Sequence, residues 1–193
     1  MPRVKLFNKN KVLKRAIDLF WKKGFYATSM QDLVDYLGIS RSSLYDTFGG
    51  KKALFDNALK SYCSDNVQAT NDFLKSQSSV KEGFRKLFEI LITESINDTE
   101  KKGCFVVNST TELAQKDKDI LEILINNKST FEDIFYEFLL SGQRSGEISK
   151  DKDIKAIASL IYTLFSGIKV ITKIETDKNK LTSSIKTVLT LLN

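Results

Sequence analysis

The side chains best suited to bind an anionic partner lie in two short runs of the N-terminal third of this 193-residue chain. Arg41 can donate two hydrogen bonds to a guanine edge, and Ser42 can contact a base or a phosphate. Tyr45 can reach a phosphate or pack on a sugar. The hydroxyls of Thr28 and Ser29 flank the free backbone N–H groups of a predicted helix start, which is a ready site for a phosphate. These residue types indicate nucleic-acid binding.

A short helix followed by a glycine turn must position Thr28 and Ser29. Apolar residues recur at i, i+3, i+4 and i+7 from Met30 to Leu37, so they form one buried stripe. The spacing of Thr28 and Gln31 predicts a capping box at the start of this helix. Gly38 can adopt the left-handed conformation that a tight turn needs. The pattern therefore predicts a helix that stops at residue 38.

A second short helix must position Arg41, and Ser40 is its predicted N-cap. Leu44 and Phe48 lie four residues apart and face inward, which leaves Arg41 and Tyr45 on the outer side. Two short helices joined by a glycine turn are a helix-turn-helix, whose second helix enters the DNA major groove. An earlier helix, capped at residue 8 or 10 and ended by Gly24, packs across both. A basic arm is expected over residues 1–8.

Several linked motifs carry a family resemblance. They are Gly-aromatic-x-x-Thr-Ser-Met-x-x-Leu at 24–33, Gly-Ile-Ser at 38–40, Leu-Tyr-x-x-Phe at 44–48 and Lys-x-x-Leu-Phe at 51–55. Together they resemble the DNA-binding domain of the TetR/AcrR family of ligand-responsive transcriptional repressors over roughly residues 9–60.

The resemblance implies roles for Lys51 and Tyr45, and the chain departs from the family pattern at Lys52 and Thr47. Lys51 matches the phosphate-contacting lysine of the family, and Tyr45 corresponds to a tyrosine that touches the DNA backbone. Lys52 replaces a frequent acidic residue and should raise nonspecific DNA affinity. Thr47 stands where the family commonly has histidine, so the backbone contact from that side chain is in doubt.

Composition excludes several functional classes. The chain has no histidine, the commonest general base and metal ligand. Its two cysteines, Cys63 and Cys104, form neither a disulfide framework nor a zinc-ligand pair, and no P-loop or dinucleotide-binding glycine pattern occurs. We therefore expect no catalytic site, no metal and no cofactor.

Charge is divided unevenly along the chain. Residues 1–60 carry 12 Lys+Arg against 5 Asp+Glu, whereas residues 61–193 carry 18 against 19. The basic part coincides with the helix-turn-helix, as a phosphate-binding module requires. We expect a DNA-binding domain at 1–52, a connecting helix at about 51–74, and a second domain at 53–193.

The second domain reads as helical throughout. Apolar stripes predict helices starting near residue 80, at about 117–141, at about 154–168 and at 181–192. Residues 103–110 favour a strand by propensity. We nevertheless predict a short helix to about Ala114, because a lone strand would have no partner. The expected fold is all-α, with about nine helices.

An apolar pocket with sparse polar groups is expected in this domain. Eight of the thirteen phenylalanines lie from residue 73 onward, and most must fill the core. The candidate lining residues are Phe84, Phe88, Phe105, Asn108, Phe131, Phe135 and Tyr162. An unidentified apolar or aromatic effector would bind them and, as the resemblance implies, shift the fourth helix and alter the spacing of two recognition helices.

The last two helices are the predicted homodimer interface. Adequate specificity on a palindromic operator requires two recognition helices about 34–36 Å apart. The penultimate helix is apolar on more than one face, so a four-helix bundle between two subunits would bury the excess. The candidate interface residues are Ile157, Ile161, Leu164, Phe165, Ile168, Ile185, Val188 and Leu192.

Two alternatives stay open from sequence. A thiol-based redox regulator would use Cys63 or Cys104, with Lys101 and Lys102 beside the latter. A helical enzyme or structural protein that does not bind DNA could use the same fold. The N-terminus lacks a secretory apolar run, and the stretch 156–168 is too short to cross a bilayer, so we expect a cytoplasmic protein without membrane contact.

Overall fold

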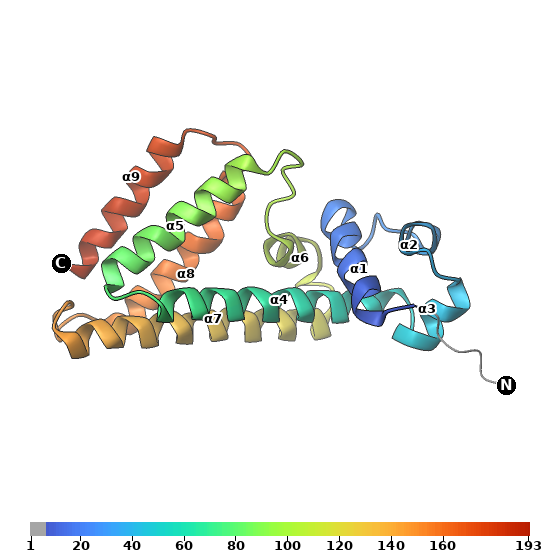
Figure 1. Cartoon of the computed structure of the whole chain (residues 1–193), viewed down its shortest axis with the longest axis horizontal. Helices are drawn as coiled ribbons and strands as arrows, with labels where there is room; N and C mark the ends of the chain where they lie inside the picture. Colours follow the sequence, from blue (N-terminus) through green and yellow to red (C-terminus); the bar gives the residue numbers. More distant parts are fainter. Residues whose placement is uncertain (1–6) are drawn as a thin grey trace.

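The computed structural model describes residues 7–193 and places nine α-helices and no strand in them (Figure 1). The helices are α1 (Lys9–Lys23), α2 (Met30–Leu37), α3 (Arg41–Phe48), α4 (Lys51–Lys75), α5 (Val80–Asn97), α6 (Phe105–Leu113), α7 (Lys118–Ser145), α8 (Ile154–Ile171) and α9 (Lys178–Leu189), followed by a 3₁₀ turn. The all-α prediction is confirmed. Most of the predicted basic arm, residues 1–6, lies outside the described residues.

Helices α1, α2 and α3 form a small unit at one end of the molecule (Figure 1). The Asn8 side chain caps α1, and Gly24 ends that helix. Gly38 ends α2 in the left-handed conformation with φ 67°, Ile39 is buried beneath the turn, and Ser40 caps α3. The helix-turn-helix has the local structure that its sequence predicts.

The core of this unit continues into the rest of the chain. Phe55 of α4 packs edge-on against Phe20 of α1 and also against Phe105 of α6, with ring centroids 4.9 and 5.4 Å apart. Leu113 of α6 and Ile120 of α7 belong to the same buried cluster. Residues of α4, α6 and α7 therefore complete the core of the three-helix unit.

A second core fills the opposite end, among α5, α7, α8 and α9. Helix α4 crosses the whole molecule alongside α7, while α5 packs against α9 and α8 packs against α7 (Figure 1). Phe84, Phe88 and Phe135 are completely buried there. Helices α4 and α7 therefore both contribute residues to the two cores.

The predictions for the segment after Gly103 and for the end of the long helix α7 can be compared with the structure. The segment after Gly103 is helix α6, so the prediction made against strand propensity is confirmed. Helix α7 runs four residues past the predicted end at 141, because Gly142 is buried against Val80 and Ile148 and continues the helix. Gly146, at φ 81°, ends it instead.

Helix α8 is the one described helix that is long and apolar enough to span a membrane by length and composition alone. Its 18 residues have a mean hydropathy of 1.6. One face, which includes Ile161 and Phe165, is buried in the second core. A core helix that has a second apolar face also meets these length and composition criteria, and α8 is such a helix.

The Glu147 carboxylate caps the start of α5 from a distant loop. Its oxygens accept hydrogen bonds from the Val80 and Lys81 N–H groups at 2.7 and 2.9 Å and from the Ser79 hydroxyl at 2.7 Å. Burial alone would raise the pKa of Glu147, but these donors outweigh it and lower the pKa.

Glu147→Gln is expected to lower the free energy of unfolding by about 1–2 kcal/mol at pH 7. The folded-state pKa is depressed, so the carboxylate stabilises the fold above its unfolded pKa of about 4.3 and loses that effect as pH falls through the folded value. Urea unfolding at pH 7 and below pH 4 should show the difference between the two proteins shrink. A pH-independent difference would contradict the assignment.

Candidate nucleic-acid interface and effector cavity

Helix α3 presents a polar face to solvent. Leu44 is fully buried, whereas Arg41, Ser42 and Tyr45 are exposed, with Tyr45 at 49%. Among residues 7–193, no ion pair within 4.0 Å engages the Arg41 guanidinium. The three side chains of α3 that are predicted to contact DNA therefore share one accessible helix face.

The start of α2 differs from the prediction in one respect. The capping box is formed by Ser29 and Asp32, and not by Thr28 and Gln31. Thr28 is fully buried, and its hydroxyl donates to the Gly24 carbonyl at 2.6 Å. The Thr28 hydroxyl therefore has a structural role in the turn between α1 and α2. Ser29 stays exposed at the helix N-terminus.

The two lysines at the start of α4 have different surroundings. The Lys51 ammonium lies 4.4 Å from the centre of the Phe25 ring, and burial lowers its pKa. The Lys52 ammonium lies 2.8 Å from Asp56 and 3.1 Å from Asp117. Lys52 is therefore paired with carboxylates of its own chain.

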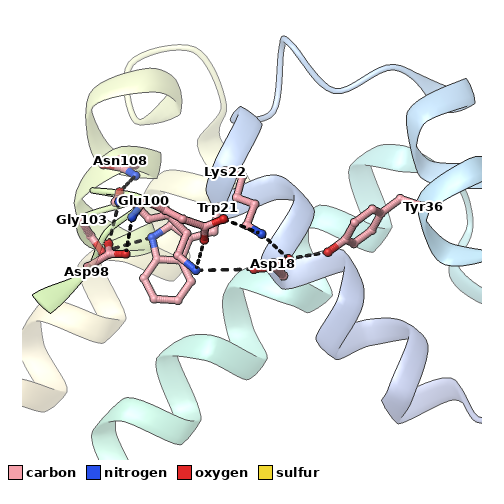
Figure 2. Close-up of polar contacts among 9 residues, drawn as sticks. Asp18, Trp21, Lys22, Tyr36, Asp98, Glu100, Gly103 and Asn108 are labelled. Atoms are coloured by element: carbon pink, nitrogen blue, oxygen red, sulfur yellow. Dashed lines mark hydrogen bonds and ion pairs between the residues drawn. The ribbon is translucent and has the colours of Figure 1, made fainter. Parts of the chain in front are cut away.

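A polar network joins α1 to the loop between α5 and α6, which we call the 98–104 loop (Figure 2). The Trp21 indole donates to the Gly103 carbonyl at 3.2 Å, and Lys22 pairs with Glu100 at 3.0 Å. The Asp98 carboxylate accepts the Lys102 N–H at 2.7 Å and so folds the loop on itself. The loop thereby holds the DNA-binding unit against the second domain.

The same network continues into α2. Tyr36 donates to the Asp18 carboxylate, which also pairs with Lys22 at 3.2 Å (Figure 2). Burial alone would raise the pKa of Asp18, but the hydrogen bonds from Tyr36 and Lys22 lower it. Asp18 therefore stays an anion at neutral pH and links α1, α2 and the 98–104 loop.

Glu112 of α6 makes a second connection between the domains. Its carboxylate accepts the Phe25 and Tyr26 N–H groups at 3.1 and 2.8 Å. A Cβ at Gly24 would lie 2.9 Å from this carboxylate, so the absence of a side chain there lets Glu112 approach. The turn between α1 and α2 is fixed to α6 as a result.

A partly open cavity of about 460 Å³, which we call the main cavity, lies among α4, α5, α8 and the 98–104 loop. A hollow of similar volume on α1 beside Tyr36 is more open and is lined mainly by polar residues. Trp21 of α1 also reaches the wall of the main cavity, so the DNA-binding unit contributes to it directly. Its size falls within the range of small-molecule sites. The apolar part of the wall consists of Ala69, Phe73, Leu87, Ile90, Leu91 and Phe165.

The predicted pocket residues do not line this main cavity. Phe84, Phe88, Phe105 and Phe135 are at most 1% exposed and fill the two cores. Phe131 and Tyr162 line a separate inner chamber of about 20 Å³, which is large enough for about one water molecule. Asn108 lies beside the main cavity and binds Lys173 there.

Both cysteines are buried in the structure. Burial raises the pKa of the Cys63 thiol to about 12, and the nearby Cys104 adds to the effect. A thiolate at Cys63 is therefore disfavoured at neutral pH. Cys104 is the N-cap residue of α6 and touches both the main cavity and the inner chamber.

Five of the predicted interface residues turn inward. Ile161, Phe165, Ile168, Ile185 and Leu192 are at most 6% exposed and pack in the second core of their own subunit. Residues on the outer side of α8 instead form an apolar stripe with spacings of three and four, namely Ile157, Leu160, Leu164, Gly167 and Ile171. Leu160 and Ile171 are 41% and 43% exposed.

The sequence contains partial signals for the cavity that were missed. Tyr62, Asn66, Ala69 and Phe73 follow a helical stripe along α4, and Lys169 and Lys173 are four residues apart. Trp21 has no such signal, because its place depends on how α1 docks on the 98–104 loop. Periodicity alone cannot separate a cavity wall from a packed core.

Comparison with known families agrees with this geometry. Residues 12–58 match the family model described as bacterial regulatory proteins, tetR family, and residues 82–188 match the tetracyclin repressor-like C-terminal domain. An uncharacterized HTH-type transcriptional regulator of Bacillus subtilis, YezE, is 34% identical over 194 residues and covers both chains completely. The transcriptional repressor ComR of Escherichia coli is 28% identical over 87% of this chain and 80% of its own.

Solved structures show the same architecture. A cysteine mutant of the regulator CifR, complexed with 26-base-pair operator DNA, superposes with a TM-score of 0.86 at 25% identity, covering 99% of this chain and all of its own. The reduced form of Escherichia coli NemR superposes with a TM-score of 0.83 at 16% identity, over 95% and 96% of the two chains, and this shows the fold alone.

Proposed function

Because this chain belongs to the TetR family of bacterial regulatory proteins, we propose that it represses transcription as a dimer that releases its operator when a small molecule enters the main cavity. The protein is a ligand-responsive DNA-binding regulator and not an enzyme. Regulators of this family are soluble DNA-binding proteins. We place this one in the cytoplasm, where its DNA partner is.

The observation that carries the proposal is the exposed face of α3. Arg41 can reach a guanine edge in the major groove, while Ser42 and Tyr45 contact the base or the backbone. Ser29, at the N-terminus of α2, and Lys51, at the N-terminus of α4, flank this face and bind phosphates. Thr28 and Lys52 instead make contacts within the protein, with the Gly24 carbonyl and with Asp56 and Asp117 respectively.

The dimer is proposed to form through the outer stripe of α8. Spacings of three and four residues give a continuous apolar seam, and Gly167 leaves room for a close approach by a second helix. A two-fold axis through Leu164 would pair each stripe with its copy. Val188 of α9 and Leu191 of the following 3₁₀ turn extend the apolar surface.

Operator release is proposed to follow two routes from the cavity. One is the shift of α4, which lines the cavity with Tyr62 and Phe73 and begins at the DNA-binding unit. The other is the 98–104 loop, which contacts Trp21 and Lys22 directly. A ligand acts only through its different affinities for the bound and released arrangements.

The redox alternative receives less support. Cys63 is buried with a raised pKa, so it lacks the properties of a sensor thiol. Cys104 remains the candidate thiol for that hypothesis, since it reaches the cavity wall.

Operator binding by two variants tests the proposal. Arg41→Ala should weaken operator binding by about 1–3 kcal/mol and relax base preference at one position, because it removes a base contact. Lys51→Ala should weaken all DNA sequences alike and reduce the salt slope by about one per subunit. Fluorescence anisotropy at several salt concentrations measures both quantities.

Lys60→Ala is the matched control, because Lys60 is exposed on α4 beyond the DNA-binding unit. It should leave base preference unchanged. If Arg41→Ala and Lys51→Ala bind the operator and random DNA as the control does, α3 is not the recognition helix.

A further inference from the structure

The main cavity has two chemically different sides. Apolar side chains of α4 and α5 form one side, and the other side meets the end of α8, where Lys169 and Lys173 line the wall. Lys169 lies in the last turn of α8, and Lys173 lies in the turn that follows the helix, so both reach the same wall. Both are half-buried.

Neither lysine is neutralised by a carboxylate. The ion pairs within 4.0 Å among residues 7–193 engage Lys102 and Lys180 near this region, but not Lys169 or Lys173. The Lys169 ammonium lies 4.1 Å from the centre of the Phe165 ring, which forms part of the cavity floor. Lys169 therefore holds its charge over an apolar surface.

The Lys173 side chain packs directly against the backbone of Gly103. A Cβ at Gly103 would overlap Lys173 Cε, so glycine at this position is what lets the side chain cross the 98–104 loop. Asn108 Oδ1 accepts one hydrogen bond from the ammonium at 3.0 Å. An ammonium carries three donors, so two are left for a ligand.

The other charged side chains at the cavity wall are Glu94, Asp98, Lys101 and Lys102. The Asp98 carboxylate accepts backbone N–H groups of its own loop, and Lys102 pairs with Glu100 at 2.9 Å. Lys101 is exposed on the loop. Glu94 of α5 is exposed, and its carboxylate lies more than 4.0 Å from the Lys169 and Lys173 ammonium groups. The half-buried charges at the wall are Lys102, Lys169 and Lys173 against Asp98, so their sum is positive.

We propose that the effector is an apolar monocarboxylate, whose carboxylate binds Lys169 and Lys173 and whose hydrocarbon body lies against Phe73, Leu87 and Leu91. This inference rests on the proposed function, since it names the chemical class of the ligand in that cavity. Charge-assisted hydrogen bonds in a partly desolvated site select the anion over a neutral molecule of the same shape.

The head-group position also connects the ligand to DNA binding. Asn108, which accepts from Lys173, donates through Nδ2 to the Lys102 carbonyl at 2.8 Å. The adjacent Gly103 carbonyl accepts from Trp21 of α1. A carboxylate that draws Lys173 away from Asn108 therefore loosens the loop that holds α1.

Matched ligands test the charge selection. Decanoate and 4-cyclohexylbutyrate are compared with 1-decanol and 4-cyclohexylbutanol by isothermal titration calorimetry at pH 7.5. Trp21, the single tryptophan, lines the cavity and reports binding by fluorescence. Each carboxylate should bind at least about tenfold more tightly than its alcohol, in keeping with contacts of this kind.

Charge-removing variants locate the selection. Lys169→Gln with Lys173→Gln should abolish the preference for the carboxylate and leave alcohol affinity unchanged. Lys155→Gln removes an exposed charge from the first turn of the same helix and serves as the matched control. Thermal unfolding of each variant confirms that it is folded.

Operator release is measured separately in the same preparations. Carboxylates that do not bind, alcohols that bind as tightly, or a double variant that keeps the preference would each overturn the inference. Loss of operator binding by the ligand-free protein would instead refute the proposed function. A carboxylate that binds through both lysines without releasing the operator would refute its role as effector.

Discussion

Leu160→Asp is expected to convert the protein into folded monomers and to weaken operator binding about 10²–10⁴-fold. Leu160 lies in the outer stripe of α8 and is 41% exposed, so a charge there costs little in the isolated subunit. In the dimer, the aspartates would be buried near each other without partners. The second recognition helix then no longer binds at the high effective concentration that the dimer provides.

Two further variants make this result specific. Ile125→Asp places the same charge on α7 at a position that is 55% exposed and outside the stripe, and it should leave the dimer intact. Ile168→Asp, in the inward stripe, should unfold the subunit because Ile168 is 4% exposed in its own core. Light scattering, circular dichroism and anisotropy separate these outcomes. A dimeric Leu160→Asp protein with full operator affinity would move the interface elsewhere.

Glu112→Ala should lower the free energy of unfolding by about 2–3 kcal/mol, because two backbone N–H groups lose a charged acceptor. For a chain of this size, that is a fall in melting temperature of roughly 4–12 °C. Operator affinity should decrease as well, since the turn between α1 and α2 is then no longer fixed to α6.

Glu122→Ala is the control for this prediction, because Glu122 is exposed on α7. Glu112→Gln should fall between the two, since an amide retains one acceptor oxygen. Calorimetric melting curves that are the same for Glu112→Ala and Glu122→Ala would show that the Glu112 contacts contribute nothing to the junction.

Local rules were enough to predict most of the helices. Gly38 and Gly146 end helices in the left-handed conformation, as glycine permits. The helix after Gly103 was predicted despite β-branched residues, because no partner strand exists. The capping box was misassigned since Ser29 and Asp32 have the same spacing as Thr28 and Gln31, and only the structure shows which hydroxyl is buried.

The cavity was less predictable for a physical reason. A phenylalanine such as Phe135 and a phenylalanine such as Phe73 have the same helical periodicity, yet one fills a core and the other lines a cavity. The difference arises from where the 98–104 loop crosses, and no local pattern determines that. The inward and outward faces of α8 were confused similarly, because both are apolar.

The aromatic contact from Phe20 through Phe55 to Phe105 makes the DNA-binding unit a poor candidate for transplantation. A fragment cut after α4 would expose the surfaces that Phe105, Leu113 and Ile120 cover. A chimera that joins this DNA-binding unit to the second domain of a relative would therefore have to include α6 and the start of α7. Whether the DNA-binding unit folds when it is moved to another protein therefore depends on the aromatic packing among α1, α4 and α6, and not only on where the chain is cut.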